Sequence, residues 1–201
     1  DWLKKQGIKP EKYLGQHFIL SKKALRKMIE AAEIKINDLI SEIGPGLGTL
    51  TQELAETGAK IIAIEKDQKM IPILRETLVN HKNIKIVQAD ARQLLIKSIR
   101  SPTSGGLGIS GGENGYKIVA NLPYNIATFL IRQWLELKNL PELMVLMIQK
   151  EVARRIVAKP PHSNLLAISV QFYADVKIIG YVPKNAFWPE PKVDAAIIKI
   201  T

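Results

Sequence analysis

The chain has 201 residues and no cysteine, and 46% of its residues are hydrophobic and 24% are charged. This composition is typical of a globular domain, and it excludes a disulfide framework, thiolate catalysis and disorder of the whole chain. The formal net charge of +10 makes nucleic acid a candidate partner.

The basic charge is concentrated at the start of the chain. Residues 1–27 contain eight basic and two acidic residues, which give this segment a net charge of +6. Four ring-bearing side chains that could stack on nucleobases lie among the bases: Trp2, Tyr13, His17 and Phe18. We therefore expect this basic N-terminal segment to contact a polyanion.

Strand-like and helix-like patterns alternate along the rest of the chain. Apolar runs predict strands at 38–43, 60–65, 84–88, 116–120, 143–148, 176–182 and 193–200. Amphipathic stretches predict helices at 21–32, 49–56, 68–79, 125–137, 150–158 and 165–173. This order predicts an α/β fold with a doubly wound, mostly parallel sheet of seven strands. The last two strands are close in sequence, which indicates that one of them runs antiparallel.

A stretch rich in Gly and Ser interrupts this alternation at residues 97–115. It shows no apolar periodicity, and strand-like sequence resumes directly after it. We expect a flexible surface loop inside one domain and not a linker between two domains.

Three successive strand ends carry residues suited to binding a nucleoside. A glycine-rich turn at 44–48 follows the first strand, Glu65 ends the second and Asp90 follows the third. A carboxylate at the second strand end can accept hydrogen bonds from both hydroxyl groups of a ribose. Asp90 could form a hydrogen bond with an adenine amino group. Pro45 has no N–H group, so the turn is a poor pyrophosphate cradle. The pattern fits S-adenosylmethionine better than a dinucleotide.

A second motif, at residues 121–124, follows the fourth long strand. The side-chain oxygen of Asn121 and the carbonyl oxygen of Leu122 can both accept hydrogen bonds from one exocyclic amino group. Pro123 fixes the backbone so that these acceptors converge. Two acceptors would localise the nitrogen lone pair of an aromatic amine and make it nucleophilic without a strong base. Tyr124 could stack on the base.

These motifs occur in the order found in the ribosomal RNA adenine N6,N6-dimethyltransferase family, and the chain most resembles its bacterial small-subunit (KsgA-type) branch. The matching segments are 15–19, 42–48, Glu65, Asp90, 121–124, 149–155 and 183–194. The resemblance implies a Rossmann-like methyltransferase fold and dimethylation of N6 of adjacent adenosines in a small-subunit rRNA hairpin loop, a step in ribosome biogenesis.

The resemblance also implies roles for single residues. The cofactor S-adenosylmethionine would contact His17, Ile19, Gly44, Gly46, Glu65, Asp90 and Asn121. The target base would be held by Asn121, Leu122 and Tyr124, with Phe187 on its other face. Core packing is the other interpretation of Phe187.

We expect residues 1–201 to form one catalytic domain, without the helical C-terminal domain in which the family usually ends. No long apolar run, leader-like start or cluster of histidines is present. We therefore expect a cytoplasmic monomer that needs neither membrane nor metal. Two alternatives stay open: a large-subunit adenine methyltransferase of the macrolide-resistance type, and a non-catalytic nucleic-acid-binding homologue. Pro45 and Thr49 disfavour a nicotinamide dehydrogenase.

Overall fold

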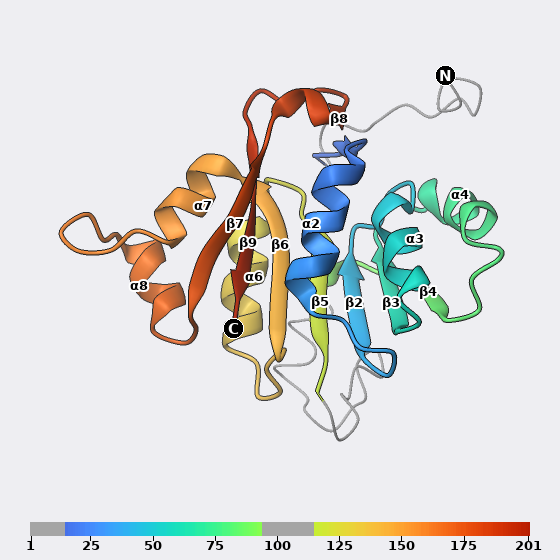
Figure 1. Cartoon of the computed structure of the whole chain (residues 1–201), viewed down its shortest axis with the longest axis horizontal. Coiled ribbons are helices and arrows are strands. Elements are labelled where there is room, and N and C mark those ends of the chain that lie inside the picture. The colour runs from blue at the N-terminus through green and yellow to red at the C-terminus, as the bar shows by residue number, and fades with distance from the viewer. Residues whose placement is uncertain (1–14, 94–114) are drawn as a thin grey trace.

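The computed structural model describes residues 15–93 and 115–201. The expected flexible loop at 97–115 and the first half of the basic segment therefore lie almost wholly outside the described residues. The helices, shown in Figure 1, are α2 (Lys22–Ala32), α3 (Thr49–Glu56), α4 (Met70–Thr77), α6 (Ala127–Leu135), α7 (Lys150–Ile156), α8 (Leu165–Gln171) and the 3-10 turn η2 (Lys184–Ala186). The strands are β1 (Phe18–Ile19), β2 (Leu39–Ile43), β3 (Lys60–Glu65), β4 (Ile84–Gln88), β5 (Lys117–Asn121), β6 (Leu143–Gln149), β7 (Val176–Val182), β8 (Phe187–Trp188) and β9 (Ala195–Ile200).

Seven strands form the main sheet, in the order β4-β3-β2-β5-β6-β9-β7. The pairs among β2, β3, β4, β5 and β6 are parallel, whereas β9 runs antiparallel to both of its neighbours, β6 and β7. This arrangement confirms the predicted α/β fold with a mostly parallel, seven-stranded sheet and one antiparallel strand.

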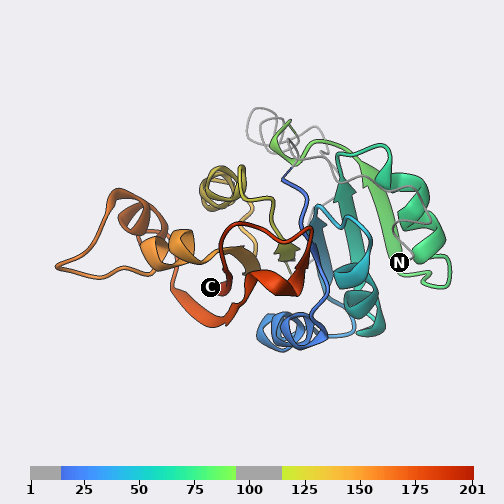
Figure 2. The ribbon, with the colours of Figure 1, turned by 90° about the horizontal axis from the view of Figure 1, so that it is seen from above.

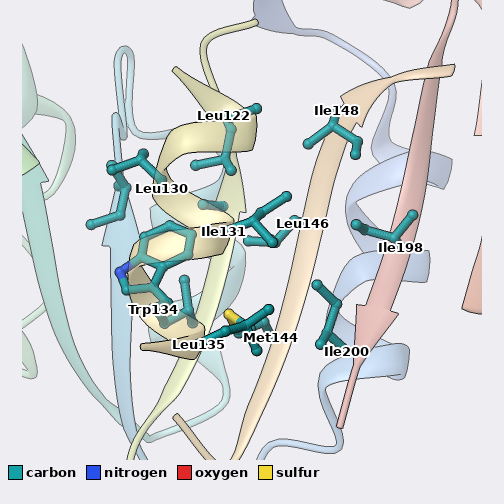
Figure 3. Packing of buried hydrophobic residues seen from close by; sticks show 14 of the residues in the cluster. Leu122, Leu130, Ile131, Trp134, Leu135, Met144, Leu146, Ile148, Ile198 and Ile200 are labelled. Atoms are coloured by element: carbon teal, nitrogen blue, oxygen red, sulfur yellow. The ribbon is translucent and has the colours of Figure 1, made fainter. Parts of the chain in front are cut away.

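The sheet is covered by helices on both faces, as the two ribbon views show (Figures 1 and 2). Alternate residues of each central strand enter two different cores, because successive side chains of a strand point to opposite faces. On β6, Val145 and Met147 pack with α2 and α3, whereas Leu146 and Ile148 pack with α6. Figure 3 shows the second core, in which Trp134 of α6 lies with the strand residues. Burial on both faces explains why the strands read as continuous apolar runs.

A second, two-stranded sheet was not predicted. In it, β1 pairs antiparallel with β8, with Phe18 opposite Trp188 and Ile19 opposite Phe187. The backbone N–H of Leu20 also donates to the carbonyl oxygen of Ala186 at 2.8 Å. This small sheet ties the segment before α2 to the segment between β7 and β9.

The predicted helices are all present, and most end a few residues earlier than expected. Ser21 caps α2 as predicted, because its hydroxyl oxygen accepts a hydrogen bond from the backbone N–H of Ala24 at 3.3 Å. Across residues 15–93 and 115–201, no helix is long and apolar enough to cross a bilayer.

Candidate active site

One cavity of about 330 Å³ lies at the carboxyl ends of the parallel strands. This is the place where open α/β sheets bind ligands, and the volume falls in the range of small-molecule sites. Nine of the ten predicted site residues line it: His17, Ile19, Gly44, Gly46, Glu65, Asp90, Asn121, Leu122 and Tyr124.

The glycine-rich turn after β2 forms part of the cavity wall. Gly46 has a φ of +57°, and a Cβ atom at this position would lie 2.9 Å from Cε1 of Phe18. The position therefore requires glycine both for its backbone conformation and for the close approach of β1. The Phe18 ring in turn stacks on Trp188 with 6.2 Å between ring centroids. The glycine turn thus packs directly against the Phe18 side chain of the two-stranded sheet.

Glu65 ends β3 with its carboxylate fixed by the backbone. Its Oε1 accepts a hydrogen bond from the N–H of Asp67 at 2.8 Å, and its Oε2 accepts one from the N–H of Gly46 at 3.1 Å. The residue is 6% exposed, and burial raises the pKa of this carboxyl group. A carboxylate offers about four lone-pair positions, so these backbone bonds leave acceptor capacity for hydroxyl donors from the cavity.

A second acid, Glu42 on β2, is buried beside Glu65. Its Oε2 has no hydrogen-bond partner, and it lines the same cavity. Burial raises the pKa of Glu42 to about 8, and the nearby charge of Glu65 acts in the same direction. Glu42 belongs to the 42–48 motif, but no role was expected for it; its position near the strand end, just before the glycine turn, was the available signal.

Asp90 lines the cavity but is already engaged by cations. Its Oδ2 lies 3.1 Å from Nζ of Lys66 and 2.8 Å from Nη2 of Arg92. The hydrogen bond from Arg92 is the largest cause that lowers the pKa of Asp90 to about 2. Lys66 and Arg92 also line the cavity. Neither was expected at the site from the sequence, although each lies within two residues of a predicted strand-end acid.

Asn121 ends β5 and is oriented by the segment that precedes β1. Its Nδ2 donates a hydrogen bond to the carbonyl oxygen of His17 at 3.1 Å. The His17 ring is itself placed by a 2.7 Å contact between its Nδ1 and the carbonyl oxygen of Pro189. The amide nitrogen of Asn121 is therefore committed, and its oxygen remains to accept a hydrogen bond from a ligand.

Leu122 and Tyr124, which follow Asn121, both line the cavity and both have buried groups. The Leu122 side chain is buried in the core under α6, and its N–H donates to the carbonyl oxygen of Met147 at 3.0 Å. The Tyr124 ring lies 5.7 Å from the His17 ring, centroid to centroid. The Tyr124 hydroxyl is buried without a partner, and burial raises its pKa to about 12. Tyr124 therefore offers a neutral aromatic ring to the cavity at neutral pH.

Phe187 is the one predicted site residue that the structure does not bring to the cavity. Its side chain is 3% exposed and packs in the core with Ile19, Met28 and Ile197. Pairing of β8 with β1 places it opposite Ile19. In this structure the Phe187 ring therefore does not reach the cavity, where it was expected to cover the second face of a target base. Its position agrees with the other interpretation, core packing.

Within the described part of the chain, no three His, Cys, Asp or Glu side chains are grouped so that they could hold a metal ion.

Comparison with known proteins gives consistent matches. The family model described as "Ribosomal RNA adenine dimethylase" matches residues 8–201. A protein of Dehalococcoides mccartyi (strain CBDB1) named "Ribosomal RNA small subunit methyltransferase A" is 44% identical over 193 residues, which cover 96% of this chain and 63% of that protein. The chain therefore spans less than two thirds of the length of such curated relatives.

Two solved structures share the fold at TM-scores of 0.75. One is a dimethyladenosine transferase from Plasmodium falciparum, which is 32% identical; the match covers 92% of this chain and 62% of that one. The other is the 23S rRNA methyltransferase ErmE, which is 27% identical; the match covers 91% of this chain and 68% of that one.

Proposed function

Because the chain belongs to the ribosomal RNA adenine dimethylase family, we propose that it dimethylates N6 of adjacent adenosines in a small-subunit rRNA hairpin loop, with S-adenosylmethionine as the methyl donor. The observation that carries the proposal is the orientation of Asn121. Its amide nitrogen is bound to the carbonyl oxygen of His17, so its oxygen is left to accept from the amino group of a substrate.

The cavity suits S-adenosylmethionine in shape and in charge. Glu65 has two preset oxygens for the ribose hydroxyl groups. Glu42 supplies a second carboxyl group close by, whose ionised form would be favoured by a cationic ligand. His17, Ile19, Gly44 and Gly46 would complete the contact surface. When bound, S-adenosylmethionine supplies a methyl group on a positively charged sulfur, which keeps the bonding electron pair as the methyl group leaves.

The protein prepares the attacking nitrogen without a strong base. Asn121 and the main-chain carbonyl of Leu122 each accept a hydrogen bond from N6 of the target adenosine. These bonds favour tetrahedral nitrogen and localise its lone pair, which forms the new bond to carbon. They also become stronger as N6 gains positive charge, so they stabilise the transition state more than the ground state. N6 then releases one proton to solvent, and a second cycle adds the second methyl group.

Tyr124 would support the flipped base by stacking. Its ring lines the cavity next to His17, and aromatic stacking contributes about 1–3 kcal/mol per base in nucleic-acid complexes.

The charge of the chain supports an rRNA substrate. Residues 1–27 carry a net charge of +6, and within the described part of that segment Lys22, Lys23 and Arg26 are exposed on α2. We infer that this basic segment contacts rRNA phosphates, and that the protein acts as a monomer in the cytoplasm on the immature small ribosomal subunit.

The test is transfer of labelled methyl groups to three substrates in parallel: small subunits that lack the modification, modified small subunits, and large-subunit rRNA. Digestion to nucleosides identifies the product. We expect N6,N6-dimethyladenosine from the unmodified small subunits alone. Asn121→Ala is the matched control for contaminating activity.

Two other outcomes correspond to the open alternatives. Label in large-subunit rRNA alone would assign to the chain a 23S rRNA methyltransferase activity like that for which ErmE is named. Binding of S-adenosylmethionine and rRNA without any transfer would indicate a non-catalytic nucleic-acid-binding protein, or a need for further residues of the kind present in the longer relatives. Transfer by a chimera extended with those residues would separate these two.

A further inference from the structure

Asp90 has no acceptor position left for a ligand. Its Oδ1 accepts from the backbone N–H of Arg92 at 3.0 Å and from Nε of Arg92 at 3.2 Å. Its Oδ2 accepts from Nη2 of Arg92 at 2.8 Å and contacts Nζ of Lys66 at 3.1 Å. A carboxylate offers about four lone-pair positions, so these four contacts use all of them.

Of the two cations that contact Asp90, Arg92 makes the stronger interaction. The guanidinium group meets the carboxylate through two parallel N–H groups, which is the strong bidentate form of this ion pair. Asp90 is 11% exposed at its side chain, whereas Arg92 is 43% and Lys66 48% exposed. Both cations can therefore move into solvent, while Asp90 stays in the cavity wall.

To bind Asp90, the adenine amino group needs a carboxylate oxygen that accepts hydrogen bonds from Arg92 in this structure. We propose that Arg92 competes with the adenine of the cofactor for Asp90, and so determines how tightly and at what salt concentration the protein binds adenosyl ligands. The inference rests on the proposed function, because it takes the cavity to be the S-adenosylmethionine site with Asp90 at its adenine end.

Removing the competitor should strengthen binding. In Arg92→Met the apolar stem of the side chain is kept and its charge and donors are lost, so the two acceptor positions of Asp90 that the guanidinium occupied become free for the adenine amino group. We expect the Kd of S-adenosylmethionine to fall about two- to fivefold, as follows from the strength of partly exposed ion pairs.

Salt gives a second readout. Added salt screens the Arg92–Asp90 pair, so the parent should bind S-adenosylmethionine more tightly in 0.5 M than in 0.05 M NaCl. Arg92→Met should lose most of this dependence. The matched control is Arg132→Met on α6, which removes an arginine from an exposed pair with Glu136 at 2.9 Å and leaves the cavity intact. Arg132→Met should bind like the parent.

The experiment is calorimetric titration of the three proteins with S-adenosylmethionine and with S-inosylhomocysteine, after thermal unfolding has shown that each is folded. The inosyl ligand has an oxygen in place of the amino group, so only its neighbouring N1–H could donate to a freed Asp90, and its affinity should rise less in Arg92→Met than that of S-adenosylmethionine.

Three other results would contradict the inference. Unchanged or weaker binding of S-adenosylmethionine by Arg92→Met would overturn the inference, because Arg92 would then be neutral or a ligand contact. An equal gain for the inosyl ligand would also overturn it, since the gain would not pass through the amino group. Failure of all three proteins to bind S-adenosylmethionine would overturn the proposed function together with it.

Discussion

The side-chain nitrogen of Asn121 is hydrogen-bonded to the main-chain carbonyl oxygen of His17 at 3.1 Å. This bond joins the end of β5 to the residue before β1, and β1 is itself paired with β8. The proposed nucleophile-activating amide is therefore oriented by a residue that lies 104 positions earlier in the sequence.

Asn121→Ala should remove the activating acceptor and leave RNA binding intact. Loss of a preorganised partner of this kind lowers the turnover rate on the order of 10²–10³-fold, and single-turnover methyl transfer at saturating cofactor and rRNA measures it. Asn121→Asp keeps an acceptor but cannot donate to the carbonyl of His17, so we expect an intermediate rate. A parent-like rate for Asn121→Ala would refute the proposed activation of N6.

Tyr124→Phe should be tolerated, because the hydroxyl that it removes is buried and has no partner. We expect methyl transfer near the parent rate, and a free energy of unfolding that is unchanged or about 1 kcal/mol higher. Tyr124→Ala should lose stacking, worth roughly 1–3 kcal/mol. Denaturant unfolding and single-turnover transfer of the two variants provide the comparison; an inactive but folded Tyr124→Phe would show that the hydroxyl participates.

Glu65→Ala should weaken S-adenosylmethionine binding by about 1.5–3 kcal/mol, the usual range for lost hydrogen bonds to a charged group. Glu65→Gln should also bind weakly, since its amide would place an NH₂ group against the N–H of Gly46 or of Asp67. Calorimetric titration of the folded variants measures both effects. Affinity equal to that of the parent in either one would place the ribose elsewhere.

Stability should fall as pH rises from about 4.5 to about 8, because burial raises the pKa of Glu42 from 4.5 to about 8. In this window the folded protein keeps a proton that the unfolded chain has lost, so the free energy of unfolding decreases by up to about 1.4 kcal/mol per pH unit. Below the window both states are protonated, and above it both are ionised.

Glu42→Gln tests this assignment, because glutamine does not titrate. Urea unfolding at several pH values should show a shallower decline for Glu42→Gln than for the parent. The raised pKa of Glu65 contributes a remaining slope of the same sign. Identical slopes in the two proteins would mean that Glu42 does not hold the extra proton.

The sequence was sufficient to predict the main sheet and most of the cavity. Parallel strands buried on both faces are strongly apolar, as in β6, and their carboxyl ends lie at one edge of the sheet. Residues at those ends, such as Glu65, Asp90 and Asn121, were therefore expected to converge, and they do.

The features that the sequence did not predict depend on contacts between distant segments. A two-residue strand has no periodicity, so the pairing of β1 with β8 left no local signal, and the burial of Phe187 follows from that pairing. The occupation of Asp90 by Arg92 depends on side-chain geometry that a sequence pattern does not contain. Glu42 belongs to the 42–48 motif, but only its burial in the folded protein shows that its pKa is raised.

The position of β9 has a consequence for the order of folding during synthesis. Because β9 lies between β6 and β7, β7 emerges from the ribosome before the strand that joins it to the sheet. At about 5–20 residues per second, the open edge of β6 and the isolated β7 coexist for about 1–4 s in the nascent chain. Unpaired strand edges are sites of misassociation. The nascent chain should therefore be most open to chaperone binding in the interval between emergence of Val182 and emergence of Ile200 from the ribosome.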